Sequence, residues 1–246
     1  MQKLVFLNKI NGIYFFKKWL SGLFLILFIS LLAIYSGHAT SSDSQFWTSI
    51  TAMVPASKDS PKIRYWLESQ NRIGDEVSQL SQFILRPGIG YELTPFTSVW
   101  LGYARIYTAA PFTNDPFDEN RIWQQLLWSK RFTHWHATVR GRLEQRFMPN
   151  SIHTEWRYRH LFKGAFAIPH HDKYTFVLSD ELFFHLNDFN HQNNQGFDQN
   201  RFFTGFGYKT NKNTTVEIGY LSQVINRIGR ENYSGNNLLI SLLVNI

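Results

Sequence analysis

The feature that most constrains this chain is a two-residue alternation of polar and apolar side chains, clearest in the stretch HWHATVRGRLEQRFM at residues 134–148. Polar groups fill the even positions and apolar groups most odd ones: His134, His136, Thr138, Arg140, Arg142, Glu144 and Arg146 against Trp135, Val139, Leu143 and Phe147. A period of two is typical of a β-strand with two different faces. The polar face meets either bulk water or the interior of a barrel whose outside contacts lipid.

The same alternation recurs along the chain, and no segment after residue 39 keeps a helical period for long. It predicts strands at 45–54, 62–72, 79–93, 97–109, 119–132, 134–148, 152–168, 173–187, 198–210, 214–226 and 236–246. Most reach the roughly 9–11 residues that a tilted membrane strand needs. Short connections alternate with longer polar ones, as in outer-membrane barrels whose long loops lie outside the cell.

The number of candidate strands conflicts with the usual parity of bacterial barrels. The candidates number eleven, whereas single-chain bacterial barrels have an even number of strands. The first, 45–54, has the weakest pattern and is followed by Pro55 and Pro61. We therefore predict an all-β, antiparallel up-and-down transmembrane β-barrel of about ten strands within residues 40–246, with twelve as the alternative. An even number places both termini in the periplasm and leaves five outer loops when there are about ten strands.

Residues 1–39 are predicted to be a secretory signal peptide. Four lysines form a positive n-region, an apolar run follows at 23–35, and small residues offer cleavage after Ala39. That run is shorter than the roughly 20 residues of a spanning helix, although an uncleaved inner-membrane anchor at 19–35 is the alternative. Without these lysines the net charge falls from +7 to +3, which weakens any case for nucleic acid as a partner.

The composition fits an exported membrane barrel. The chain has no cysteine, 17% aromatic residues and a slightly polar mean hydropathy. A barrel combines these properties, because only alternate residues face lipid and aromatic residues form girdles at both interfaces. The predicted location is the outer membrane of a Gram-negative bacterium, with outer-membrane lipid and the barrel-assembly machinery as partners. A soluble periplasmic sandwich or lipocalin-like binding barrel, with the aromatic face inward, is the competing fold.

An ordered set of short motifs carries a family resemblance. The chain contains, in this order, LRPGIGYELTPFTSVWLGYARIY, RIWQQLLW, RLEQRF, SDELFFHLND, GFDQNRFFTGFGY and EIGYLSQ. Together they resemble domain of unknown function 2490, an uncharacterised family of bacterial outer-membrane proteins, over most of residues 45–246. The resemblance implies an exported β-barrel and no established activity.

If the barrel faces are assigned this way, many charged residues point into the lumen. The predicted lumen charge network is Arg64, Glu68, Arg86, Glu92, Arg140, Arg142, Glu144, Arg146, Glu155, Arg157, Arg159, Glu181, Arg201 and Glu217. One interpretation is a set of arginine–carboxylate pairs that fills a narrow barrel. The other is a selective path or a pocket for an anionic group, since arginines outnumber acids on the 134–148 strand.

Catalysis and metal binding receive weaker support. A barrel hydrolase or lipid-modifying enzyme would use rim residues such as His153, His160, His185 and His191 with Ser151, Glu155, Asp188 and Asp198. No short motif links a nucleophile, a base and an acid. The pair His170–His171 with Asp172 follows Pro169 and is predicted to be a solvated turn, and RPG at 86–88 a bend or bulge. We predict a non-catalytic barrel, structural or passing small solutes, with no cofactor and no metal.

Overall fold

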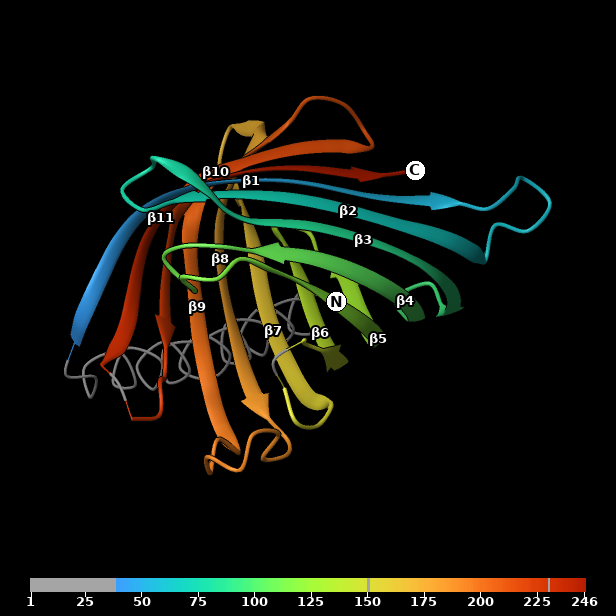
Figure 1. The fold of residues 1–246 in the computed structure, drawn as a ribbon. Helices are drawn as coiled ribbons and strands as arrows, with labels where there is room; N and C mark the ends of the chain where they lie inside the picture. The colour runs from blue at the N-terminus through green and yellow to red at the C-terminus, as the bar shows by residue number, and fades with distance from the viewer. Residues whose placement is uncertain (1–38, 150, 230) are drawn as a thin grey trace, which may run out of the picture. The chain divides into compact units, whose positions relative to one another are not determined.

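The computed structural model describes residues 39–149, 151–229 and 231–246, and these form one closed β-barrel (Figure 1). The predicted signal peptide falls outside the described residues except for its last one, Ala39. The eleven strands of the described chain are β1 (Ala39–Pro55), β2 (Ile63–Gly74), β3 (Gln79–Thr94), β4 (Thr97–Thr108), β5 (Phe117–Arg131), β6 (Trp135–Phe147), β7 (Glu155–Ile168), β8 (His171–His185), β9 (Gly196–Lys209), β10 (Thr214–Ile225) and β11 (Asn232–Asn245).

Sequential strands pair in antiparallel fashion around the wall, and the barrel closes between its first and last strands. There β1 pairs with β11 in parallel, with Ala39 beside Asn232 and Met53 beside Asn245. The predicted count of ten or twelve is therefore wrong, because all eleven candidate strands exist within the described residues. The weakly patterned β1 was discounted on the even-number rule, yet it is hydrogen-bonded along both edges.

Because the strand number is odd, the start of β1 and the end of β11 lie at opposite rims of the barrel. The two strands run in the same direction, so both start at one rim and both stop at the other. The expectation that both termini lie on one side is therefore wrong. Such a parallel seam is forced by parity, since an up-and-down path of eleven strands finishes in the direction in which it started.

The two barrel ends differ in their connections. At the end where β1 stops, four of the five connections are short: 95–96, 132–134, 169–170 and 210–213, beside the longer 56–62. We call this the short-turn end. The opposite end carries 75–78, 109–116, 148–154, 186–195 and 226–231, and we call it the long-loop end.

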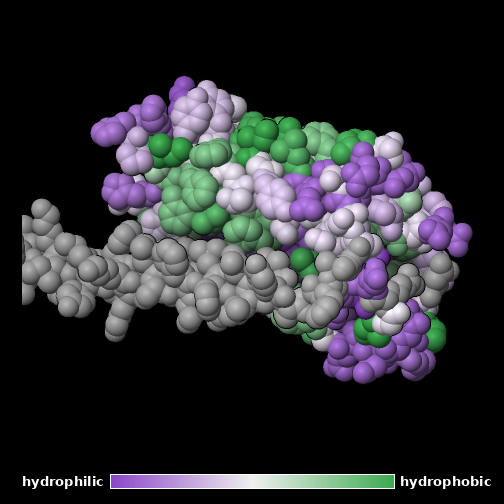
Figure 2. All heavy atoms as spheres, turned by 90° about the vertical axis from the view of Figure 1, so that its left-hand side faces the viewer, coloured by the Kyte–Doolittle hydropathy of each residue, from purple (hydrophilic) through white to green (hydrophobic). Residues whose placement is uncertain are grey.

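The outward face of the wall is apolar. Leu101 on β4, Leu126 on β5 and Phe206 on β9 are 53%, 52% and 56% exposed. On the visible part of Figure 2, hydrophobic residues gather in the middle, with hydrophilic residues to either side. The competing soluble fold would have turned this face inward, and the structure instead leaves it on the surface. Among the described residues, no helix is long and apolar enough to cross a membrane.

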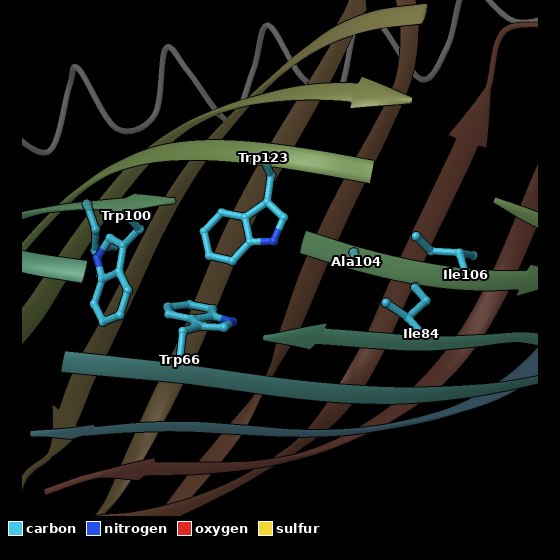
Figure 3. Close-up of a cluster of buried hydrophobic side chains, with 7 residues drawn as sticks. Trp66, Ile84, Trp100, Ala104, Ile106 and Trp123 are labelled. Atoms are coloured by element: carbon cyan, nitrogen blue, oxygen red, sulfur yellow. The ribbon is translucent and has the colours of Figure 1, made fainter. Parts of the chain in front are cut away.

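One side of the lumen is filled by tryptophans rather than charges. Trp66, Trp100 and Trp123 converge from β2, β4 and β5, with ring centroids 5.4 and 6.1 Å from Trp66 (Figure 3). A Cβ on Gly88 or Gly102 would overlap the Trp123 ring, so these glycines make room for it. No bulge lies at 86–88, because β3 and β4 keep one register from Leu85–Arg105 to Gly88–Gly102, although the ladder lacks the pairs at Arg86 and Pro87.

Candidate functional site

The centre of the lumen is a buried carboxylate surrounded by arginines. Glu144 on β6 is fully buried. Its oxygens accept hydrogen bonds from Arg157 and Arg159 on β7 at 2.8 Å each, and from Arg121 on β5 at 3.4 Å. Arg86 on β3 lies 3.8 Å away across the lumen. Charges taken out of water in this way are stable only when they are paired and hydrogen-bonded.

The ion pairs continue toward the long-loop end. Arg146 holds Glu119 through its Nε and Nη2 atoms at 2.5 and 2.9 Å, and its Nη1 lies 2.8 Å from both oxygens of Glu155. The imidazole of His185 lies between Glu155, at 3.0 Å, and Asp198, at 3.4 Å. Asp198 also accepts a hydrogen bond from Arg157. These contacts link β5 to β9 and fill this end of the lumen with paired charges.

Toward β2, the network is completed by a second carboxylate. Glu68 accepts a hydrogen bond from Arg86 at 2.5 Å and lies 3.9 Å from Arg142. Arg142 is fully buried, donates to Gln125 at 2.7 Å and lies 4.7 Å from the Trp123 ring centroid. Cation–π contact of this kind lets a guanidinium leave water beside the tryptophan cluster.

Beyond this network the lumen opens into a cavity of about 510 Å³ at the short-turn end. Glu68, Arg140, Arg159 and Glu181 form the boundary between the ion-pair network and the cavity, and we call this boundary the floor. The cavity lining includes eight Lys or Arg residues: Arg72, Arg131, Arg140, Arg159, Lys163, Arg201, Lys209 and Lys212. Only three acids line it, namely Glu68, Glu181 and Glu217. The cavity therefore carries a positive excess of five.

The fourteen residues of the predicted lumen network all have side chains on the inward face, but they do not form one cluster. Arg64 and Glu92 pair at 2.8 Å near the short-turn end, where Arg64 also donates to the Met53 carbonyl. Glu217 pairs with Lys163 at 2.6 Å in the cavity wall. Arg201 lines the cavity. The others belong to the floor and to the ion pairs behind it: Glu68, Arg86, Arg140, Arg142, Glu144, Arg146, Glu155, Arg157, Arg159 and Glu181.

Lumen residues absent from the predicted set include Arg72, Glu119 and Arg121, and Lys163 and Asp198, which pair with Glu217 and Arg157. The alternation could have found the first three. Arg72 has the same parity as Arg64 and Glu68 on the predicted 62–72 strand. Glu119 and Arg121 occupy the first inward positions of the predicted 119–132 strand. Extending the period of two to the ends of these strands would have added all three to the set.

The rim residues considered for catalysis do not form a nucleophile–base pair. Both ring nitrogens of His185 face carboxylates, so neither is left for a hydroxyl. Ser151 Oγ donates to the His153 carbonyl at 2.6 Å. His153 and His191 contact each other edge to face, with ring centroids 5.2 Å apart. His160 is an outward residue of β7, and its Nδ1 atom lies 2.8 Å from the Tyr158 hydroxyl.

The remaining acid and the histidine pair belong to connections. Asp188 binds the backbone N–H groups of Gln192 and Asn193 at 3.0 Å each. Desolvation opposes the effect, but these backbone donors hold the pKa of Asp188 below its usual value. His170 has a φ of 65° in the turn before β8, and His171 begins that strand. No group of three potential metal ligands is found within the described residues.

The fold and this lumen define a class of protein: a closed all-β barrel with a paired-charge interior and an open cavity at the short-turn end. The chain belongs to the family described as "Protein of unknown function (DUF2490)", which matches residues 44–234. The resemblance seen in the sequence motifs is thus confirmed. The chain is similar to the uncharacterized protein MexAM1_META1p0181 of Methylorubrum extorquens. The two are 31% identical over 204 residues, which cover 80% of this chain and 87% of the relative. Its fold is also similar to the NanC porin structure, with a TM-score of 0.48 and 15% identity, over 83% of this chain and 99% of that one.

Proposed function

We propose that this protein is a non-catalytic barrel of a Gram-negative outer membrane that admits small anionic solutes into its lumen from the short-turn end. Its apolar outer wall supports contact with lipid, because an exposed apolar surface running around a protein is unfavourable in water. The protein reaches the outer membrane through an export signal in residues 1–39 and the barrel-assembly machinery. With the long loops outside the cell, the cavity faces the periplasm.

The observation that carries the proposal is the charge of the open cavity. Eight basic residues and three acids line about 510 Å³ of space, and the floor below them is closed by ion pairs. A low-dielectric wall concentrates the field of such an excess and raises the local concentration of anions. Two lysines lie at the mouth, Lys209 at the end of β9 and Lys212 on the turn 210–213, where they meet an entering solute first.

The closed floor determines what kind of passage is expected. Arg159 and Glu144 are joined at 2.8 Å, and Arg159 and Glu181 at 2.7 Å, so this level of the lumen is occupied by side chains. A solute therefore reaches a binding cavity, and ions that continue must pass between packed groups. The barrel should show a small, anion-selective conductance.

Two measurements test this function in sequence. Mature protein extracted from outer membranes is compared cold and boiled on a gel, where a heat-dependent mobility shift marks a closed membrane barrel. Recovery in the soluble periplasmic fraction without such a shift contradicts the location. Planar bilayers under a salt gradient then give conductance and reversal potential. A large, unselective conductance contradicts the closed floor, and cation selectivity contradicts the anion assignment.

A further inference from the structure

Two arginines of the cavity differ from every other arginine of the buried network. Arg72 on β2 and Arg201 on β9 lie against the same indole, with guanidinium carbons 3.9 and 5.2 Å from the Trp47 ring centroid. Because both lie against one ring, their guanidinium carbons are at most about 9 Å apart, a range over which two buried like charges repel. Among the described residues, no carboxylate forms an ion pair with either, whereas each remaining buried arginine of the network has one. Two like charges thus lie against one buried ring and neither forms an ion pair, although Glu181 is the cross-strand neighbour of Arg201.

The donors of Arg72 are only partly used. The residue is 4% exposed and lines the cavity. Its Nη1 and Nη2 atoms donate to the neutral amides Gln82 and Gln70 at 2.6 and 2.8 Å, and its Nε is buried without an acceptor. A buried donor without a partner is rare and unfavourable, as is a buried cation that faces only neutral groups. The structure offers this group no anion of its own.

Arg201 is in the same situation for a different reason. Its cross-strand neighbour is Glu181, whose Oε1 accepts from Arg140 at 2.6 Å and from Arg159 at 2.7 Å, but no hydrogen bond joins that carboxylate to Arg201. The Nε of Arg201 is also buried without an acceptor, and the guanidinium rests on the Trp47 and Phe183 rings. Aromatic faces hold the guanidinium in place but do not neutralise it.

We propose that Arg72 and Arg201 form a binding site for the oxyanion group, carboxylate or phosphate, of a small solute. The inference rests on the proposed function, and it names the position in the cavity where the anion is held. Guanidinium groups bind both oxyanions through paired N–H donors, and an anion bound by both arginines would offset their like charges. The Ser241 hydroxyl accepts a hydrogen bond from Ser49 at 2.7 Å in the cavity wall and keeps its own proton to donate to the rest of the solute.

The site is tested by equilibrium binding to the folded barrel in detergent at low salt. The probes are sodium phosphate and sodium acetate, and the readouts are calorimetry and tryptophan emission, since Trp47 contacts both arginines. In Arg72→Gln and Arg201→Gln, we expect Kd to rise roughly 10- to 100-fold, the loss of one charge-assisted contact. Lys212→Gln removes a charge at the mouth and reports the general field of the cavity, so it should raise Kd less than either arginine substitution. Lys58→Gln, at an exposed lysine outside the cavity lining, is the matched control and should leave Kd unchanged.

A second variant guards against simple misfolding. Arg201→Lys keeps the charge but loses the planar fork, so its affinity should lie between wild type and Arg201→Gln. Each variant must also keep the heat-dependent gel shift. Tighter binding of phosphate assigns a phosphorylated solute and tighter binding of acetate a carboxylate, and either supports the site.

The failures of the two proposals can be told apart. Anion binding that Arg72→Gln, Arg201→Gln and Lys212→Gln weaken equally reflects the general field of the cavity and overturns the site alone. The same holds for binding that neither arginine substitution weakens. A folded wild-type barrel that binds neither probe overturns both the site and the anionic cargo.

Discussion

Replacing Glu144 by Gln should cost about 3–5 kcal/mol of unfolding free energy, the usual effect of breaking a buried ion pair. The carboxylate is fully buried and receives hydrogen bonds from Arg121, Arg157 and Arg159. The amide keeps one acceptor oxygen but turns an NH₂ group toward guanidinium donors. It also leaves the surrounding arginines with one negative charge fewer.

The matched control is Glu92→Gln. Glu92 lies at the short-turn end with a side chain that is 35% exposed, and its partner Arg64 has other acceptors in Met53 and Asn245. A pair of this kind contributes about 0–1 kcal/mol. Urea titration of the purified barrel, followed by tryptophan emission, gives both midpoints, and equal slopes show that the same surface is exposed. Equal losses in the two variants would falsify the assignment of Glu144 as the centre of the network.

Three further outcomes are expected. Leu101→Arg places a cation on the outward face and should cost roughly 2–4 kcal/mol near the bilayer midplane, whereas Leu101→Ala should insert normally; comparable yields of folded barrel for both would contradict lipid contact. Gly102→Val should destabilise by about 1–3 kcal/mol because its side chain meets the Trp123 ring, and Gly141→Ala should be milder in the same urea titration. An epitope after Ile246 should be hidden in intact cells and one within 186–195 accessible; surface labelling of both would contradict the orientation.

The strand positions were predictable because each strand has one apolar and one polar face, and β6 shows the reason clearly. Arg142 and Glu144 are fully buried inside while Phe147 is exposed outside, so a shift by one residue would exchange the two environments. The parallel seam was missed because the even-number rule was preferred to the eleven candidate strands. Once eleven strands close into a barrel, the first and last must pair in parallel, as β1 and β11 do.

The candidate site was predictable in its residue types but not in its partners. Alternation placed Arg140, Arg159 and Arg201 on one interior surface. That two of them share Glu181 while Arg201 is left with aromatic rings depends on how side chains meet across the lumen. The position of the open cavity depends on the same packing, and on where the tryptophans occupy the other side of the barrel.

The parallel seam also limits how such a chain can be rearranged. In a barrel with an even strand number, the ends meet on one side, so a short linker joins them and new ends can be opened at another turn. Here the ends are separated by the length of β11, 14 residues or roughly 45 Å of strand. A circularly permuted version would need a linker of at least about 13 extended residues, laid through the filled lumen or along the apolar wall.

Duplicating a whole hairpin would keep the number of strands odd and the seam parallel. A relative with an even barrel must therefore differ by an odd number of strands, so its separation from this fold cannot be explained by duplication of complete hairpins alone.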